Sequence, residues 1–270
     1  MPLLNLELSG CLISHIMFSF FIFIFGLAVG SFLNVIICRL ETNEPILISR
    51  SHCPKCRAVL KWFNLIPVLS FTFQKGRCRC CGERISWQYP LVEIGTGLLF
   101  LLIFNFQFSP FYFTQGKIFN EFSIFKFFNI FYYLFIVSFL VIIFVYDLKH
   151  YLIPDKIIYP AILVSGIWLV FNEVLPEVPS GVLPLGRDNG LALRGGLLAA
   201  LIAGGFFIFL VLISKGRWMG LGDVKLGILM GLVLGWPNVL SSLFLAFLSG
   251  AIVGLGLIIV QKKTMKSQIG

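Results

Sequence analysis

Four cysteines in two pairs form the first candidate site in this sequence. The pairs are C-x-x-C motifs, Cys53 with Cys56 and Cys78 with Cys81, and 21 residues separate them. Each pair can offer two thiolates to one metal ion, and two pairs complete the tetrahedral shell that zinc prefers. Because four sulfur ligands leave no open position for a substrate, we expect a structural zinc ion at this site.

Two other uses of these cysteines stay open at this point. They could form disulfides, or one pair could be a redox-active C-x-x-C motif. Disulfides are disfavoured if the segment faces the reducing cytosol, as the topology below predicts, and a redox motif needs only one pair. Cys80 lies inside the second motif, where it could replace a neighbouring ligand or remain a free thiol.

Acidic residues in or beside apolar segments form the second candidate site. Asp147 directly follows the apolar run 123–146, and Asp223 follows two glycines, Gly220 and Gly222. Burying a carboxylate near a membrane is costly, so such residues are functional candidates by default. Glycine allows a backbone bend and the close approach of another segment, which favours a meeting of the two aspartates.

Two carboxylates that meet in a poorly solvated site cannot both ionise, so the pKa of one rises. The ionised member can then deprotonate water while the protonated member donates to a peptide carbonyl, which hydrolyses the bond without a covalent intermediate. The alternatives are structural: Asp147 as a helix-end cap and Asp223 as an acid favoured by the helix dipole. Asp155 resembles the start of the next helix, and Glu93 an interfacial acid paired with a basic loop residue.

The composition predicts what must position these residues. Of the 270 residues, 58% are hydrophobic and 12% are charged, which excludes a soluble globular or disordered chain and predicts an all-α polytopic membrane protein. About seven segments approach the length of roughly 20 apolar residues that a spanning helix needs. They are 14–37, 91–108, 123–146, 155–172, 191–214, 222–236 and 238–260.

Two of these segments have special features. The first is expected to remain a helix and not to be a cleaved signal, because no Lys or Arg precedes it. The sixth is short and contains Gly227, Gly231 and Gly235, so we expect it to be interrupted and to line a water-filled cavity in part.

The basic residues predict the orientation, because Lys and Arg accumulate in cytoplasmic loops. With the N-terminus outside and the Cys-rich loop and C-terminus in the cytoplasm, all but four of the 21 basic residues lie on the inner side. The four on the outer side are Lys117, Lys126, Arg187 and Arg194. The net charge of +9 then indicates contact with anionic membrane lipids, and no nucleic-acid partner is needed to explain it.

We therefore predict three regions. Residues 1–38 form the first transmembrane helix, residues 39–90 a cytoplasmic zinc-binding domain, and residues 91–270 a transmembrane domain that carries both aspartates.

Several motifs make the chain similar to a known family, the bacterial prepilin peptidases, which are type IV leader peptidases and N-methyltransferases with a G-x-G-D aspartic site. The motifs follow the family's order over nearly the whole chain. They are G-S-F-L-N-V at 30–35, S-H-C-P-K-C at 51–56, I-P-V-L-S at 66–70, G-R-C-R at 76–79, I-S at 85–86, Y-P-L-V-E at 89–93, the stretch 147–155 and G-L-G-D-V-K-L at 220–226.

The resemblance implies an aspartic endopeptidase of the bacterial inner membrane that removes the basic leader from type IV prepilin or pseudopilin precursors. It implies that Asp147 and Asp223 are catalytic and that Cys53, Cys56, Cys78 and Cys81 bind zinc. It also implies a second activity, methylation of the new amino terminus with S-adenosylmethionine. The family usually has eight transmembrane helices, one more than this sequence predicts.

Three alternatives remain. The chain could be a peptidase that lacks methyl transfer, or a membrane scaffold whose zinc loop binds a cytosolic partner without catalysis. A transporter with paired acids as a proton relay is the third. It is disfavoured because Asp147 and Asp223 are predicted at one membrane face, whereas carrier sites lie near the midplane.

Overall fold

The computed structural model describes residues 2–42, 44–45, 51–53, 55–107, 124–174, 192–217 and 219–261. Within these ranges the chain is helical and contains no β-strand, only two isolated bridges. This confirms the predicted all-α class. Two of the basic residues assigned to the outer side, Lys117 and Arg187, lie outside the described residues.

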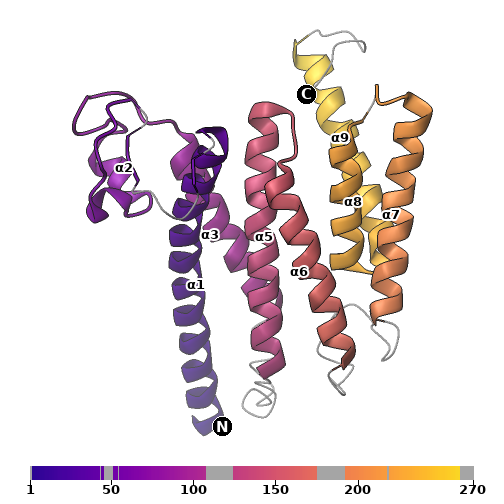
Figure 1. Ribbon diagram of the computed structural model, residues 1–270. Coiled ribbons are helices and arrows are strands. Elements are labelled where there is room, and N and C mark those ends of the chain that lie inside the picture. The colour runs from indigo at the N-terminus through magenta and orange to yellow at the C-terminus, as the bar shows by residue number, and fades with distance from the viewer. Residues whose placement is uncertain are drawn as a thin grey trace. The chain divides into compact units, whose positions relative to one another are not determined.

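The described helices follow the predicted apolar segments (Figure 1). A short 3-10 turn and a five-residue helix, α2, lie in the Cys-rich region between the first two long helices. In chain order the elements are α1 (Pro2–Thr42), η1 (Trp62–Leu65), α2 (Leu69–Phe73), α3 (Gln88–Gln107), α5 (Ile124–His150), α6 (Asp155–Val174), α7 (Ala192–Ser214), α8 (Leu221–Leu234) and α9 (Asn238–Gln261).

Six of the described helices are long and apolar enough to cross a membrane: α1, α3, α5, α6, α7 and α9. The remaining predicted segment, the sixth (222–236), corresponds to α8, which has 14 residues. At a rise of about 1.5 Å per residue it is roughly 21 Å long, shorter than a hydrocarbon core of about 30 Å. Many large apolar side chains on the six helices are exposed, such as Phe106 and Leu201, as expected for surfaces that face lipid.

The chain divides into two compact units, and the first comprises Met1–Val145. In it α1 and α3 touch backbone to backbone, because a methyl group placed on Gly26 would lie 2.7 Å from the Cα atom of Gly97, and one on Gly30 would lie 2.7 Å from the Cα atom of Glu93. Small residues at such contacts let membrane helices approach closely. The Cys-rich loop is therefore carried by two helices in tight contact.

The second unit, Tyr146–Gly270, is built around the packing of α8 against α7. A methyl group on Gly231 would collide with the Cα atom of Ala200, and one on Gly227 would collide with the Phe207 ring. The helix runs without a break from Leu221 to Leu234. The expectation that its glycines interrupt it was wrong, because Gly227 and Gly231 serve close packing and Gly235 lies just after the helix with a φ of 68°.

The division into two units concerns packing, and its boundary falls inside α5. The predicted functional regions 1–38, 39–90 and 91–270 remain a prediction.

Candidate functional site

The two C-x-x-C motifs fold as a pair of similar tight turns in the first unit. In one turn the Cys53 carbonyl accepts the Arg57 N–H at 2.9 Å, and in the other the Cys78 carbonyl accepts the Gly82 N–H at 2.9 Å. Arg57 and Gly82 have φ values of 55° and 70°, so both turns close through the left-handed region. This region favours glycine, and Arg57 occupies it with a side chain.

These turns bring four sulfur atoms together. The Sγ atoms of Cys53, Cys56, Cys78 and Cys81 all lie within 4.8 Å of one another, and those of Cys53 and Cys81 are 3.9 Å apart. Zinc–sulfur bonds of about 2.3 Å in a tetrahedron put sulfur atoms about 3.8 Å apart. None of the four is in a disulfide. The cluster is thus able to hold a metal ion.

Backbone hydrogen bonds favour the thiolate form of one member of this cluster, Cys78, whereas the pKa values of Cys56 and Cys81 are raised. The backbone N–H groups of Cys81 and Cys80 point at the Cys78 sulfur and lower the pKa of that thiol to about 7. A thiolate is the form that binds metal. Cys80 itself is exposed and lies outside the group of four, so its backbone supports the cluster while its side chain does not join it.

Polar and aromatic contacts tie the two turns to each other. The Lys55 ammonium lies 2.8 Å from the Glu83 carboxylate and joins one turn to the other, and this contact raises the pKa of Lys55. The Arg79 guanidinium lies 5.3 Å from the centre of the Phe63 ring, which joins the second turn to η1. Such exposed contacts contribute little free energy, so the four-sulfur cluster is the feature best able to cross-link the two turns.

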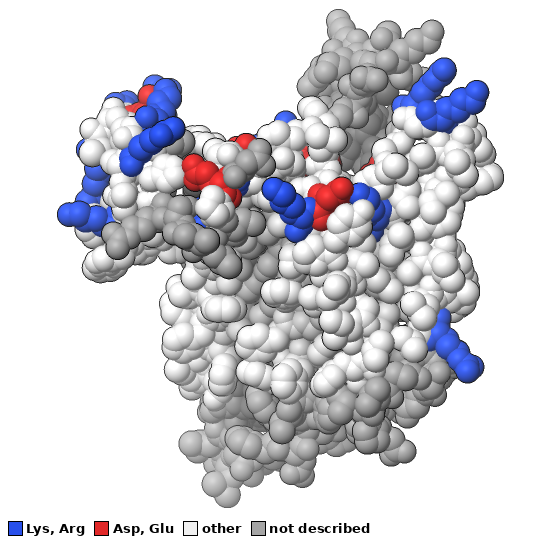
Figure 2. Space-filling model, in the orientation of Figure 1, with Lys and Arg blue, Asp and Glu red and all other residues white. Residues whose placement is uncertain are grey.

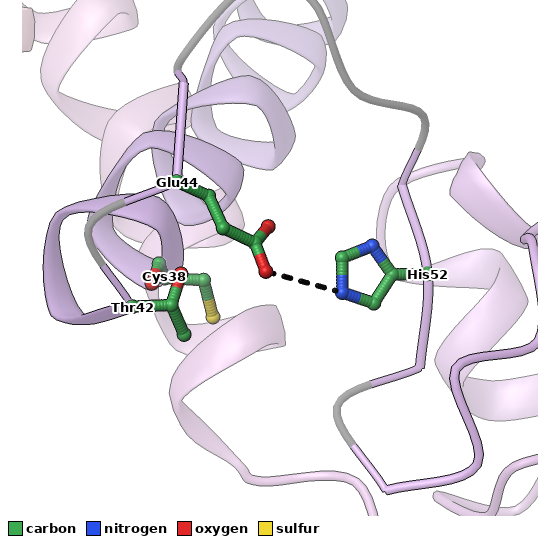
Figure 3. Close-up of polar contacts among 4 residues, drawn as sticks. All are labelled: Cys38, Thr42, Glu44 and His52. Atoms are coloured by element: carbon green, nitrogen blue, oxygen red, sulfur yellow. Dashed lines mark hydrogen bonds and ion pairs between the residues drawn. The ribbon is translucent and has the colours of Figure 1, made fainter.

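Further contacts attach this loop to its supporting helices. Nε2 of His52, beside the first cysteine, lies 3.7 Å from Oε1 of Glu44, just after the end of α1 (Figure 3). Figure 2 shows Lys and Arg side chains gathered over the loop around α2, whereas the sides of the helices in this view carry few charges. This distribution suits a polar loop carried on apolar helices.

Glu93 has a partner that the sequence did not indicate. Its buried carboxylate accepts the backbone N–H of Val68 at 2.7 Å. Val68 has a φ of 58°, an unusual conformation for a β-branched residue. The expected basic partner was wrong: Glu93 binds a backbone N–H and so fixes the loop on α3.

The two candidate aspartates lie in the second unit. Asp147 is exposed near the end of α5, and Asp223 is half-buried in the first turn of α8. Burial raises the pKa of the Asp223 carboxyl, a hydrogen bond from the Gly220 N–H at 3.2 Å opposes this, and the negative charge of Asp147 raises the pKa further. The two carboxylates are thus near enough to influence each other.

The glycines beside Asp223 have different roles. A methyl group on Gly222 would lie 3.2 Å from Cβ of Ile153, so this glycine permits close contact with the segment after α5. Gly220 has a φ of −87°, which any residue can adopt, and its N–H donates a hydrogen bond to Oδ2 of Asp223. The expected close approach is confirmed at Gly222, and Asp223 also lies in the first turn of α8, where its structural alternative, an acid favoured by the helix dipole, places it.

Comparison with known proteins gives matches along most of the chain. Residues 24–106 match the bacterial peptidase A24 N-terminal domain, and residues 134–255 match the type IV leader peptidase family. Among the similar proteins, the three described next each carry the name prepilin leader peptidase/N-methyltransferase. No solved structure gives a significant match.

The relative from Myxococcus xanthus is 35% identical over 88% of this chain and 63% of its own length. The relative from Bacillus subtilis is 34% identical over 86% of this chain and 80% of its own. The relative from Klebsiella pneumoniae is 34% identical over 84% of this chain and 89% of its own. This chain therefore spans less than two thirds of the first relative and most of the other two.

Proposed function

This chain belongs to the type IV leader peptidase family, and on that premise we propose that Asp147 and Asp223 cleave the leader from prepilin-like precursors. The observation that supports this assignment most is the effect of the Asp147 charge on the pKa of Asp223 within one unit. Two neighbouring acids of which one holds its proton more tightly can divide the roles of acid and base that hydrolysis of a peptide needs.

In the proposed reaction the two aspartates have different roles. The raised pKa of Asp223 makes it the member that holds the proton and donates it to the scissile carbonyl. Asp147, which is exposed, accepts a proton from the attacking water. The water oxygen bonds to the carbonyl carbon and forms a tetrahedral intermediate. As the C–N bond breaks, the leaving amine takes the proton that Asp147 accepted from water, and a hydroxyl of the intermediate returns a proton to Asp223 as it becomes the new carboxyl group.

The orientation of the protein belongs to the same proposal. The chain is a multi-pass protein of the bacterial inner membrane. We place its N-terminus outside and the Cys-rich loop, both aspartates and the C-terminus at the cytoplasmic side, because the basic residues concentrate there. A basic leader followed by an apolar helix would then present its cleavage point at the inner membrane surface.

The Cys-rich loop has a structural role in this proposal. Cys53, Cys56, Cys78 and Cys81 would hold a zinc ion, which stabilises a loop too small to fold around a core of its own. The relatives' name includes N-methyltransferase, and we extend that activity to this chain, with S-adenosylmethionine as methyl donor.

The test uses the full-length protein in detergent with a synthetic prepilin precursor, and mass spectrometry of the products. Asp147→Asn and Asp223→Asn are each expected to abolish cleavage while membrane insertion and metal content stay normal. Glu41→Gln, which changes an exposed acid near the end of α1, is the matched control and should cleave normally. Normal cleavage by either aspartate variant would refute the assignment.

The same assay tests methyl transfer. With S-adenosylmethionine present, the new amino terminus should gain the mass of one methyl group. Cleavage without that gain would identify a peptidase that lacks methyl transfer.

A further inference from the structure

An ion pair that spans 70 residues of sequence lies beside the proposed catalytic aspartates. The Lys225 ammonium donates to Oδ1 of Asp155 at 2.5 Å, which joins the first turn of α8 to the first turn of α6. The same ammonium lies 4.8 Å from the centre of the Tyr159 ring, one turn further along α6. Lys225 is thus held by a charge and by an aromatic face.

A second contact joins the same two segments. Gly222 lies against Ile153, and a methyl group on this glycine would be 3.2 Å from Cβ of the isoleucine. Asp223 lies between Gly222 and Lys225 in the sequence, so the chain is attached to the segment 153–155 on both sides of this aspartate. We refer to the four residues Ile153, Asp155, Gly222 and Lys225 as the clamp.

The clamp also restricts Asp147, because the chain between Asp147 and Asp155 is a short turn. The Tyr151 N–H donates to the Asp147 carbonyl at 2.8 Å, and Tyr151 has a φ of 53°, which reverses the chain directly after α5. The far end of this turn is the part that the clamp fixes on α8. The α5–α6 turn and the start of α8 lie at the same end of the second unit (Figure 1).

We propose that the Asp155–Lys225 ion pair, with the Gly222–Ile153 contact, sets the separation of Asp147 and Asp223 and so positions them for cleavage. This inference rests on the proposed function of the two aspartates. Asp155 and Lys225 are positioning residues in this account, since they act through the backbone that carries the aspartates and touch no reacting atom.

The exposure of the pair indicates where its effect should appear. The Asp155 side chain is 61% exposed and that of Lys225 is 23% exposed, and ion pairs of this kind contribute little to folding free energy. Catalysis is more sensitive, because a displacement of about 1 Å in a catalytic group can slow a reaction about 100-fold. Breaking the pair should therefore lower kcat with little change in thermal stability.

The experiment measures kcat, KM and thermal unfolding for full-length Lys225→Met and Asp155→Asn with a precursor peptide. We expect kcat to fall about 10- to 100-fold with KM nearly unchanged, because substrate binding remains while alignment is lost. Lys225→Arg should retain most of the activity. Lys156→Met, which removes the exposed lysine next to Asp155, is the matched control and should behave like the unchanged protein.

A charge exchange separates positioning from simple loss of a residue. The double variant Asp155→Lys/Lys225→Asp restores opposite charges and should recover part of the kcat that each single exchange loses. An unchanged kcat in Lys225→Met, or a double variant no better than the single ones, would overturn the proposal. A large fall in melting temperature with kcat per folded molecule unchanged would also overturn it, because the pair would then only stabilise the fold.

The aspartate variants distinguish failure of the clamp proposal from failure of the proposed catalytic function. If Asp223→Asn is inactive and Lys225→Met is fully active, the clamp is wrong and the catalytic assignment stands. If Asp223→Asn still cleaves the peptide, the catalytic assignment fails and the clamp with it.

Discussion

The Cys-rich loop and the second unit hold their candidate site residues in place by different interactions. The loop buries few large apolar side chains, and Trp62, Phe73 and Trp87 are each more than 70% exposed. Its shape depends on four sulfur atoms, two tight turns and the Glu93–Val68 hydrogen bond. The second unit instead packs glycines of α8 against α7, with Gly231 against Ala200.

Because the two regions are held by different interactions, we expect them to tolerate different perturbations. A region held by ligand bonds should fail when the ligand or the metal is lost, and should accept changes of side-chain volume. A region held by close packing should fail when one methyl group is added at a contact, and should not respond to a chelator.

The largest effect is expected from loss of the metal. Structural zinc supplies about 10 kcal/mol or more of folding free energy in small domains, so Cys81→Ser or a strong chelator should unfold the loop. Limited proteolysis should then cut between residues 51 and 87, and metal analysis should show the loss of one ion. Cys80→Ser is the control and should keep the metal. A loop that resists protease after metal removal would contradict this prediction.

The next effect is expected in the second unit. Gly231→Ala adds a methyl group that collides with the Ala200 backbone and should lower the free energy of unfolding by about 1–3 kcal/mol, because α7 and α8 must separate. Thermal unfolding in detergent measures this change. Gly254→Ala in α9 meets nothing within 4 Å among the described residues and should be neutral or slightly stabilising. Equal melting temperatures for the two variants would contradict the claim that close packing of α8 against α7 stabilises the second unit.

A smaller effect depends on pH. The raised pKa of Asp223, caused by burial and by the Asp147 charge, means that the folded protein holds this proton more tightly than the unfolded chain. Stability therefore falls as pH rises from the ordinary pKa of an aspartate through the raised one. Asp223→Asn cannot ionise and keeps an oxygen for the Gly220 N–H, so it should be more stable than the unchanged protein at neutral pH.

The check is thermal unfolding of both proteins at several pH values. The advantage of Asp223→Asn should disappear in acid, where Asp223 is protonated in both states. Asp147→Asn should give only part of the gain, because it removes the neighbouring charge and leaves the burial. A gain that is constant with pH would point to a cause other than ionisation.

The smallest effect is expected for the Lys55–Glu83 pair. Both side chains are largely exposed, and salt screens such pairs, so Lys55→Ala should leave the metal content and the protease resistance of the loop nearly unchanged. A loop that unfolds in this variant would show that charge, and not the sulfur cluster, joins the two turns.

Much of this organisation follows from sequence patterns that act locally. Long apolar runs predict the spanning helices because the membrane thickness sets their length, and the C-x-x-C spacing predicts a four-sulfur cluster because both turns are short. Composition alone also indicates that Asp147 and Asp223 are unusual, since acids are rare in such a chain.

The remaining features depend on contacts between distant segments. Glycine lowers helix stability in water-soluble proteins, and the glycines of α8 were therefore expected to interrupt this helix. Gly227 and Gly231 instead lie where α7 leaves no room for a side chain. The partners of Glu93 and Lys225 are 25 and 70 residues away. A single sequence carries no local signal for such pairings.

The contact between α1 and α3 has a practical consequence for protein engineering. Gly26 and Gly30 hold the two helices together below the Cys-rich loop, so the spacing of the loop's attachment points is set before the loop begins. A loop mounted in this way is an exchangeable module. Chimaeras that keep both helices and receive the corresponding loop of a relative should therefore preserve the helical scaffold, and would allow the contribution of each loop to be compared on one common support.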